Sequence, residues 1–152
     1  MKPLIVLLVS FVIAVIAIKI LRGFYDLRLS GRIAMSAMLL FTAIGHFVFT
    51  EGMSMMIPAF IPYKTELVYF TGAIEIGAAV GLLIPQLIFP TAWLLIAFFV
   101  LVLPANIHAA IHHIDFQKAN LTGMGADYLW FRLPLQLLFI VWIYISAILA
   151  YK

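Results

Sequence analysis

Apolar residues along this chain fall into five long runs, and shorter polar segments separate them. Each run is close to the ~20 residues with which a helix crosses the hydrocarbon core of a bilayer. We therefore expect an all-α integral membrane protein, a helix bundle that forms a single domain over residues 1–152. The predicted spans are residues 4–21, 33–50, 67–84, 87–103 and 133–150.

The first apolar run has two possible interpretations. A secretory signal peptide has an apolar core of ~7 to 15 residues and ends at a small-residue cleavage pattern. This run is longer, and it ends in IKILRG, which has no such pattern. We interpret it as a membrane helix that is retained.

Positive charges are concentrated in the segment between the first two runs. Lys19, Arg22, Arg28 and Arg32 stand there against Asp26 alone. Because loops rich in Lys and Arg stay in the cytoplasm, we expect the N-terminus outside and the C-terminus inside. The predicted location is a bacterial inner (cytoplasmic) membrane, with most polar residues, including the histidines, in its outer half.

Composition supports a membrane protein and excludes several function classes. Apolar residues make up 66% of the 152 and charged residues only 10%, whereas soluble domains are roughly half apolar. The net charge of +3 comes from too few charges to indicate nucleic-acid binding. The absence of cysteine excludes a dithiol relay, a thiolate metal site and a disulfide. Redox chemistry would need a bound cofactor.

A carboxylate stands about halfway along the third run. An ionised Glu75 would cost roughly 2.5 kcal/mol or more at that depth, so it must be paired, protonated or hydrated. On the same helix Ala73, Gly77 and Gly81 repeat every four residues and predict a ridge for close helix packing, with Glu75 roughly opposite. The carboxyl is either a structural hydrogen-bond donor or a functional group.

A histidine in the second run is the natural partner of this carboxyl. His46 lies about one turn from the outer end of its helix, in the same outer half as Glu75 of the antiparallel third helix. Pairing would offset the burial of both groups. We predict that His46 and Glu75 form an acid–base pair, with Thr42 and Thr71 beside them. The alternative is a histidine that only satisfies a helix interface.

Three more polar residues belong to the last two runs. Pro104 interrupts the fourth helix and frees a carbonyl, and Asn106 follows it. The last helix carries Arg132 in its first turn and Gln136 about one turn deeper, where an amide needs protein partners. We predict that Asn106, Arg132 and Gln136 converge with His46 and Glu75 on one outer pocket for a ligand.

A second histidine group follows at the end of the fourth run. His108, His112 and Asp115 share one helical face at i, i+4 and i+7, a spacing with which imidazoles can hold Zn or Cu. The pattern HxxxH lacks the Glu of metalloproteases. A further ligand would have to come from elsewhere in the chain, and the candidates are Glu51 and the thioethers of Met53, Met55 and Met56. The alternative is a polar helix end at the membrane interface that binds no metal.

Four segments carry a family resemblance. GRIAMSAMLLFTAIGHFVF, ELVYFTGAIEIGAAVGLLIP, LPANIHAAI and WFRLPLQLLFIVW resemble the successive helices of the DoxX-like family of bacterial membrane proteins. The resemblance covers residues 31–147 and implies a DoxX-like four-helix bundle plus one additional N-terminal helix. It also implies a relation to the small subunit of thiosulfate:quinone oxidoreductase. More distantly, the layout is similar to EXPERA-type bundles, whose buried carboxyls face lipid-like ligands.

These observations lead to four functional hypotheses. The first is a redox-associated or accessory subunit that binds a lipophilic ligand such as a quinone or another lipid in the outer pocket. The second is a membrane isomerase or oxidoreductase that uses His46 and Glu75 as acid and base. The third is a structural or assembly subunit with a membrane-protein partner or a second copy of itself. The fourth, less favoured, is Zn or Cu binding on the outer face.

Overall fold

The computed structural model describes residues 2–149, and these form a bundle of helices. No strand occurs in this part of the chain; Asp115 and Asn120 form an isolated bridge within a loop. The helices are α1 (Lys2–Arg22), α2 (Leu27–Val48), α3 (Thr50–Met56), α4 (Lys64–Gly81), α5 (Ile88–Leu101), α6 (Leu103–Ile111) and α7 (Ala126–Ile143), followed by the π-helix η1 (Tyr144–Ile148).

Four helical segments within residues 2–149 are long and apolar enough to cross a membrane. They are Lys2–Arg22, Leu27–Val48, Ile88–Ile111 and Ala126–Ile148. The remaining long helix, α4, carries Lys64, Glu66 and Glu75 among its 18 residues and is more polar. The chain is thus a helical membrane bundle, as the apolar runs predict.

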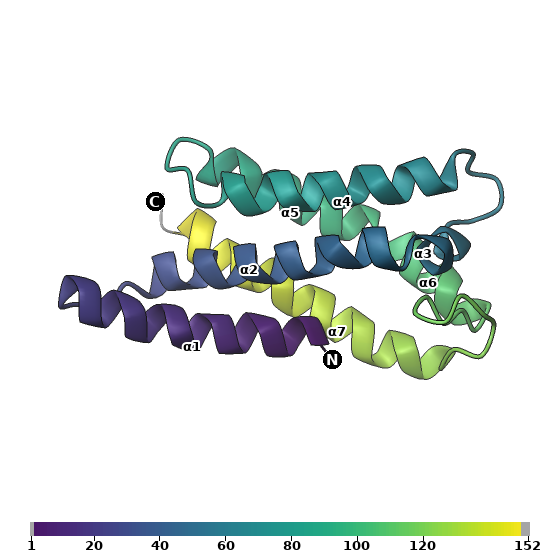
Figure 1. The fold of residues 1–152 in the computed structure, drawn as a ribbon, viewed down its shortest axis with the longest axis horizontal. Coiled ribbons are helices and arrows are strands. Elements are labelled where there is room, and N and C mark those ends of the chain that lie inside the picture. The colour runs from purple at the N-terminus through teal and green to yellow at the C-terminus, as the bar shows by residue number, and fades with distance from the viewer. Residues whose placement is uncertain (1, 150–152) are drawn as a thin grey trace.

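The helices lie side by side along the long axis of the molecule (Figure 1). α2 runs through the middle and packs against α1 on one side and α4 on the other. The α1–α2 turn, the α4–α5 turn and η1 lie at one end of the bundle, while α3 and α6 lie together at the opposite end. Consecutive long helices therefore alternate in direction.

α2 and α7 begin several residues before the apolar runs that predicted them. α2 begins at Leu27 because Asp26 caps it, accepting a hydrogen bond from the Leu29 amide at 2.9 Å. α7 begins at Ala126, so Pro134 lies inside this helix and not near its start as expected. Hydropathy marks the apolar part of a helix, whereas the backbone stays helical through polar end turns. Residue 150, the predicted end of the last span, lies outside the described residues.

The fourth span continues well past its predicted end at Leu103. A local break at Val102 separates α5 from α6, and Pro104 stands in the first turn of α6. Proline is tolerated there because the first amides of a helix have no intrahelical acceptor. Asn106 and His108 consequently lie on a helix that continues the direction of the bundle toward α3.

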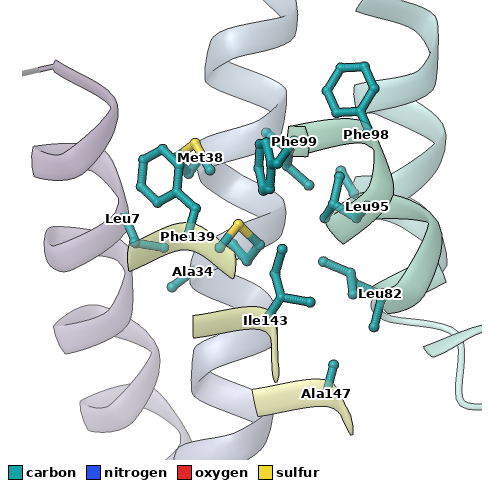
Figure 2. Close-up of a cluster of buried hydrophobic side chains, with 14 of the residues drawn as sticks. Leu7, Ala34, Met38, Leu82, Leu95, Phe98, Phe99, Phe139, Ile143 and Ala147 are labelled. Carbon is teal, nitrogen blue, oxygen red and sulfur yellow. The ribbon is translucent and has the colours of Figure 1, made fainter. Parts of the chain in front are cut away.

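The centre of the bundle is apolar. Figure 2 shows side chains from α1, α2, α5 and α7 meeting between these helices, with Met38, Phe99, Phe139 and Ile143 among them. α1 contributes little to this core, since only Leu7, Ala14 and Ile18 of its residues are buried. Leu4, Val6 and Phe11 pack partly against it, while others such as Ile5, Val12 and Ile13 are exposed, as expected for a helix in contact with lipid.

The predicted small-residue ridge on α4 is only partly packed. Ala73 and Gly77 are exposed, and a Cβ added to Gly77 would meet no atom within 4 Å. Gly81 alone is packed, against Thr91. The buried face contains Gly72 and Ala79 instead, and Glu75 lies between them on that same face. The sequence of α4 thus has small residues on two faces, and the face with Gly72 and Ala79 is the one that packs against α2.

Two glycines of α4 should respond in opposite ways to the same substitution. In Gly72→Ala the new Cβ would lie 2.9 Å from the Cβ of His46, so we expect a loss of about 1–3 kcal/mol of stability from overpacking. In Gly77→Ala the methyl meets open space, and the better helix propensity should leave stability unchanged or raise it by up to ~1 kcal/mol. Thermal unfolding in detergent, followed by circular dichroism, measures both; equal effects would contradict this packing.

Candidate functional site

His46 and Glu75 form a pair between α2 and α4. The imidazole Nε2 lies 3.5 Å from the carboxylate Oε2, and the side chains are 15% and 8% exposed. Oε2 is buried and has no hydrogen bond of normal geometry to the part of the chain that the structure describes, so the imidazole is its polar partner there. The pairing predicted from sequence is therefore present in the structure.

The other side of the imidazole fixes its protonation. Nδ1 of His46 lies 3.0 Å from the Val68 carbonyl and 3.1 Å from the Thr71 hydroxyl. The Thr71 hydroxyl itself donates to the carbonyls of Leu67 and Val68 within α4. Because a backbone carbonyl can only accept, we assign a proton to Nδ1 from this bonding pattern.

This assignment bears on the number of protons that the pair holds. With Nδ1 protonated, a neutral His46 presents a lone pair on Nε2 toward Glu75. A lone pair facing an ionised carboxylate would be repulsive, and the buried charge would be unpaired. A hydrogen bond between Oε2 and Nε2 would therefore need one further proton, on one atom or the other. Such a bonded pair would be a neutral acid beside a base or a carboxylate beside an imidazolium, with one exchangeable proton in both forms.

Helix α4 allows His46 this position because it offers small residues there. Gly72 leaves room for the His46 side chain, because a Cβ added at this glycine would lie too close to the Cβ of the histidine. Further along the same face of α4, Ser36 of α2 donates a buried hydrogen bond of 2.8 Å to the carbonyl of Ala79. α2 and α4 thus lie close together both before and after Glu75 along α4, and this close packing holds the His46–Glu75 pair in position.

Of the two threonines expected beside the pair, Thr71 lies within hydrogen-bond distance of its imidazole. The Thr42 hydroxyl donates to the Leu39 carbonyl of its own helix at 3.0 Å. Short hydroxyl side chains on a helix commonly bond to their own backbone in this way. The place of Thr42 in the pocket stays a prediction.

Asn106 and Gln136 form a second polar cluster, between α6 and α7. Nδ2 of Asn106 donates to Oε1 of Gln136 at 3.4 Å, and Nε2 of Gln136 donates to the Phe99 carbonyl. The Tyr128 hydroxyl donates to Oδ1 of Asn106 at 3.2 Å. Both amides are buried. The cluster is a chain of donors and acceptors that satisfies itself.

The residues expected to line one pocket make two separate sets of polar contacts. Among the described residues no hydrogen bond or ion pair joins the His46–Glu75 pair to the Asn106–Gln136 cluster. Arg132 is half-buried and lies near Tyr128, on the side of the second cluster. The amide groups of Asn106 and Gln136, which were expected to bind a ligand, bond to each other, and their contact with a ligand stays a prediction.

Sequence reasoning missed the participation of Tyr128 and of the Phe99 carbonyl. Tyr128 stands just before the last apolar run, where aromatic residues commonly anchor a helix at the membrane interface. The available signal was a general one, because a hydroxyl at the edge of an apolar span needs an acceptor. The Phe99 carbonyl lies in the last turn of α5, next to the break at Val102, where a backbone acceptor is available to a side chain.

The predicted metal set is not assembled. His108 and His112 do lie together, with ring centroids 4.3 Å apart. Asp115 instead accepts hydrogen bonds from the amides of Gln117 and Lys118 and lies 3.9 Å from the Lys118 ammonium. α6 ends at Ile111, so the helical spacing that placed Asp115 near the histidines does not apply. No group of three His, Cys, Asp or Glu residues within 2–149 could hold a metal ion.

The second cluster should behave as a stabilising network. Gln136→Leu would leave Nδ2 of Asn106 and the Phe99 carbonyl without partners, so we expect a loss of about 1–3 kcal/mol in stability. Gln86→Leu makes the same chemical change in an exposed turn and should stay within about 0.5 kcal/mol of the wild type. Unfolding in detergent measures both, and an unchanged Gln136→Leu would contradict the structural role.

Comparison with known proteins gives the family of the chain. No curated protein and no solved structure matches it. Residues 35–147 match the model of a family described as a domain of unknown function, DUF8561. The match extends from α2 to η1 and includes both polar clusters as well as His108 and His112. Because the matched residues make up most of the chain, this protein belongs to the DUF8561 family.

Proposed function

We propose that this protein binds a lipophilic ligand that exchanges protons, such as a quinone, at the contact between α2 and α4. The observation that carries the proposal is the contact of the largely buried His46 and Glu75 side chains at 3.5 Å, with Nδ1 of the imidazole on the Val68 carbonyl. A quinone takes up or releases protons at its oxygens when a redox partner reduces or oxidises it. A buried acid–base pair is suited to supply or receive such a proton.

The surface around the pair supports a flat apolar ligand. Phe47 and Tyr69 stack there with ring centroids 5.7 Å apart, one from each helix, and both are about half exposed. The Phe47 ring lies next to Gly72, one helical turn before Glu75. Aromatic rings pack favourably against other planar rings. We call His46, Phe47, Tyr69, Gly72 and Glu75 the α2–α4 seam.

The resemblance to DoxX-like proteins points in the same direction. That family includes a relative of the small subunit of thiosulfate:quinone oxidoreductase, and we propose a comparable role as a redox-associated or accessory subunit. The acid–base pair also suits the second hypothesis, an isomerase or oxidoreductase that acts on the bound lipid itself. Chemical conversion of the ligand would distinguish this enzyme from a binding subunit.

Binding is tested with Glu75→Gln. Removing the acid should weaken binding of a soluble quinone analogue about tenfold, the effect of losing one hydrogen bond to a charged group. Glu66→Gln is the matched control, because it makes the same change at an exposed position of α4 and should bind as the wild type does. Titration followed by tryptophan fluorescence measures both variants.

Mass spectrometry of the gently extracted protein identifies lipids that co-purify. Wild-type protein that neither retains nor binds a quinone or another lipid would refute the proposal, as would unchanged binding in Glu75→Gln. A product that forms in wild type and not in His46→Ala would establish the enzyme instead.

We further propose that α4 is a fifth membrane span, in a bacterial inner membrane with the N-terminus outside. The alternation of helix directions supports it, because α4 connects the α3 end of the bundle to the opposite end (Figure 1). Glu75 lies on the buried face of α4, and the other two charged residues of this helix, Lys64 and Glu66, lie in its first turn. The polar residues therefore do not prevent a crossing.

The native chain has no cysteine, so single cysteines report the topology directly. Ala59→Cys precedes α4 and Gln86→Cys follows it, and both positions are exposed. We expect a membrane-impermeant maleimide to label Ala59→Cys in intact spheroplasts and to label Gln86→Cys only after the membrane is opened. Labelling of both in intact spheroplasts, or of neither, would show that α4 does not cross.

A further inference from the structure

An open surface pocket, which we call the cavity, lies at the end of the bundle where α3 meets α6. It has a volume of about 300 Å³ and is lined by Met55, His108, His112, Ile114 and Leu121. α3 supplies the methionine, α6 and its C-cap supply the histidines, and the following loop supplies the two aliphatic residues. Two imidazoles and one thioether thus line a space whose other walls are apolar.

The two imidazoles are arranged as potential ligands. They stand one helical turn apart, with ring centroids separated by 4.3 Å. Nδ1 of His108 is buried and makes no hydrogen bond of normal geometry within residues 2–149, although a backbone group of Met56 acts on this imidazole as a weak hydrogen-bond partner. Buried ring nitrogens normally have a partner, so this imidazole has unused binding capacity.

The donor set selects among metals. Zn²⁺ sites in proteins use at least three His, Cys, Asp or Glu ligands, and no such trio exists within residues 2–149. The third donor on this cavity is the thioether of Met55, a soft ligand that favours Cu(I). Lys64 interacts electrostatically with His108, and a nearby positive charge opposes a divalent ion more than a monovalent one.

We propose that Met55, His108 and His112 bind a monovalent copper ion, Cu(I), in this cavity. The site uses none of the residues of the α2–α4 seam and does not depend on the function proposed there. Of the ligands considered from sequence it keeps His108, His112 and the thioether of Met55, and it leaves out the Asp115 carboxylate. Binding requires no change in the oxidation state of copper.

The test is a Cu(I) competition titration on the full-length protein in detergent, without oxygen, against a chromophoric Cu(I) chelator. Wild type should bind one Cu(I) per chain. Met55→Leu keeps the volume of the side chain and should weaken binding at least tenfold, and His112→Gln, at an exposed position, should do the same. A thermal unfolding curve of each variant shows that it is folded.

Two substitutions serve as controls. Met53→Leu removes the thioether next along α3, and His113→Asn removes the adjacent imidazole while keeping a residue that tolerates its positive φ of 52°. Neither side chain lines the cavity, and both variants should bind Cu(I) as wild type does. Absence of Cu(I) binding, equal loss in the controls, or Zn²⁺ bound in preference to Cu(I) would each overturn the proposal.

Discussion

Polar side chains inside an apolar helix bundle have to bond to one another, because the surrounding lipid offers neither donors nor acceptors. This constraint explains the arrangement of the polar residues in the present structure. Glu75 lies beside His46, and Asn106 bonds to Gln136. Each of these contacts joins two helices. The polar groups therefore also determine which helices are neighbours and at what height along the bundle they meet.

The two polar clusters satisfy the constraint to different degrees. In the Asn106–Gln136 cluster every amide function has a partner, including a tyrosine hydroxyl and a backbone carbonyl. In the His46–Glu75 pair the imidazole is anchored through Nδ1, but Oε2 of the carboxyl has only the imidazole at 3.5 Å. A fully bonded network rigidifies a structure, whereas a group with spare bonding capacity is available for a ligand or a proton. This difference is the reason to assign function to the pair.

Helix α4 shows how packing and chemistry are linked. Its buried face combines Gly72 and Ala79 with Glu75, so α2 comes close enough for His46 to reach the carboxyl and for Ser36 to reach a backbone carbonyl. Had the stripe of Ala73 and Gly77 faced α2, the carboxyl would have pointed away from the histidine. The small residues on this face are thus a condition for the pair.

The sequence by itself determined the class of protein and the local elements. Long apolar runs predicted helices of membrane-spanning length, and a carboxylate and a histidine at similar depth predicted their pairing. These inferences depend on composition and on helical periodicity, which are properties of neighbouring residues. Only the tertiary structure decided which of two small-residue stripes on α4 is buried and that Thr42 turns to its own backbone. It also decided that Asn106 and Gln136 bond to each other and that Met55, not Asp115, lies with the two histidines. Those outcomes depend on the rotation and height of each helix against its neighbours, and contacts between distant parts of the chain set both.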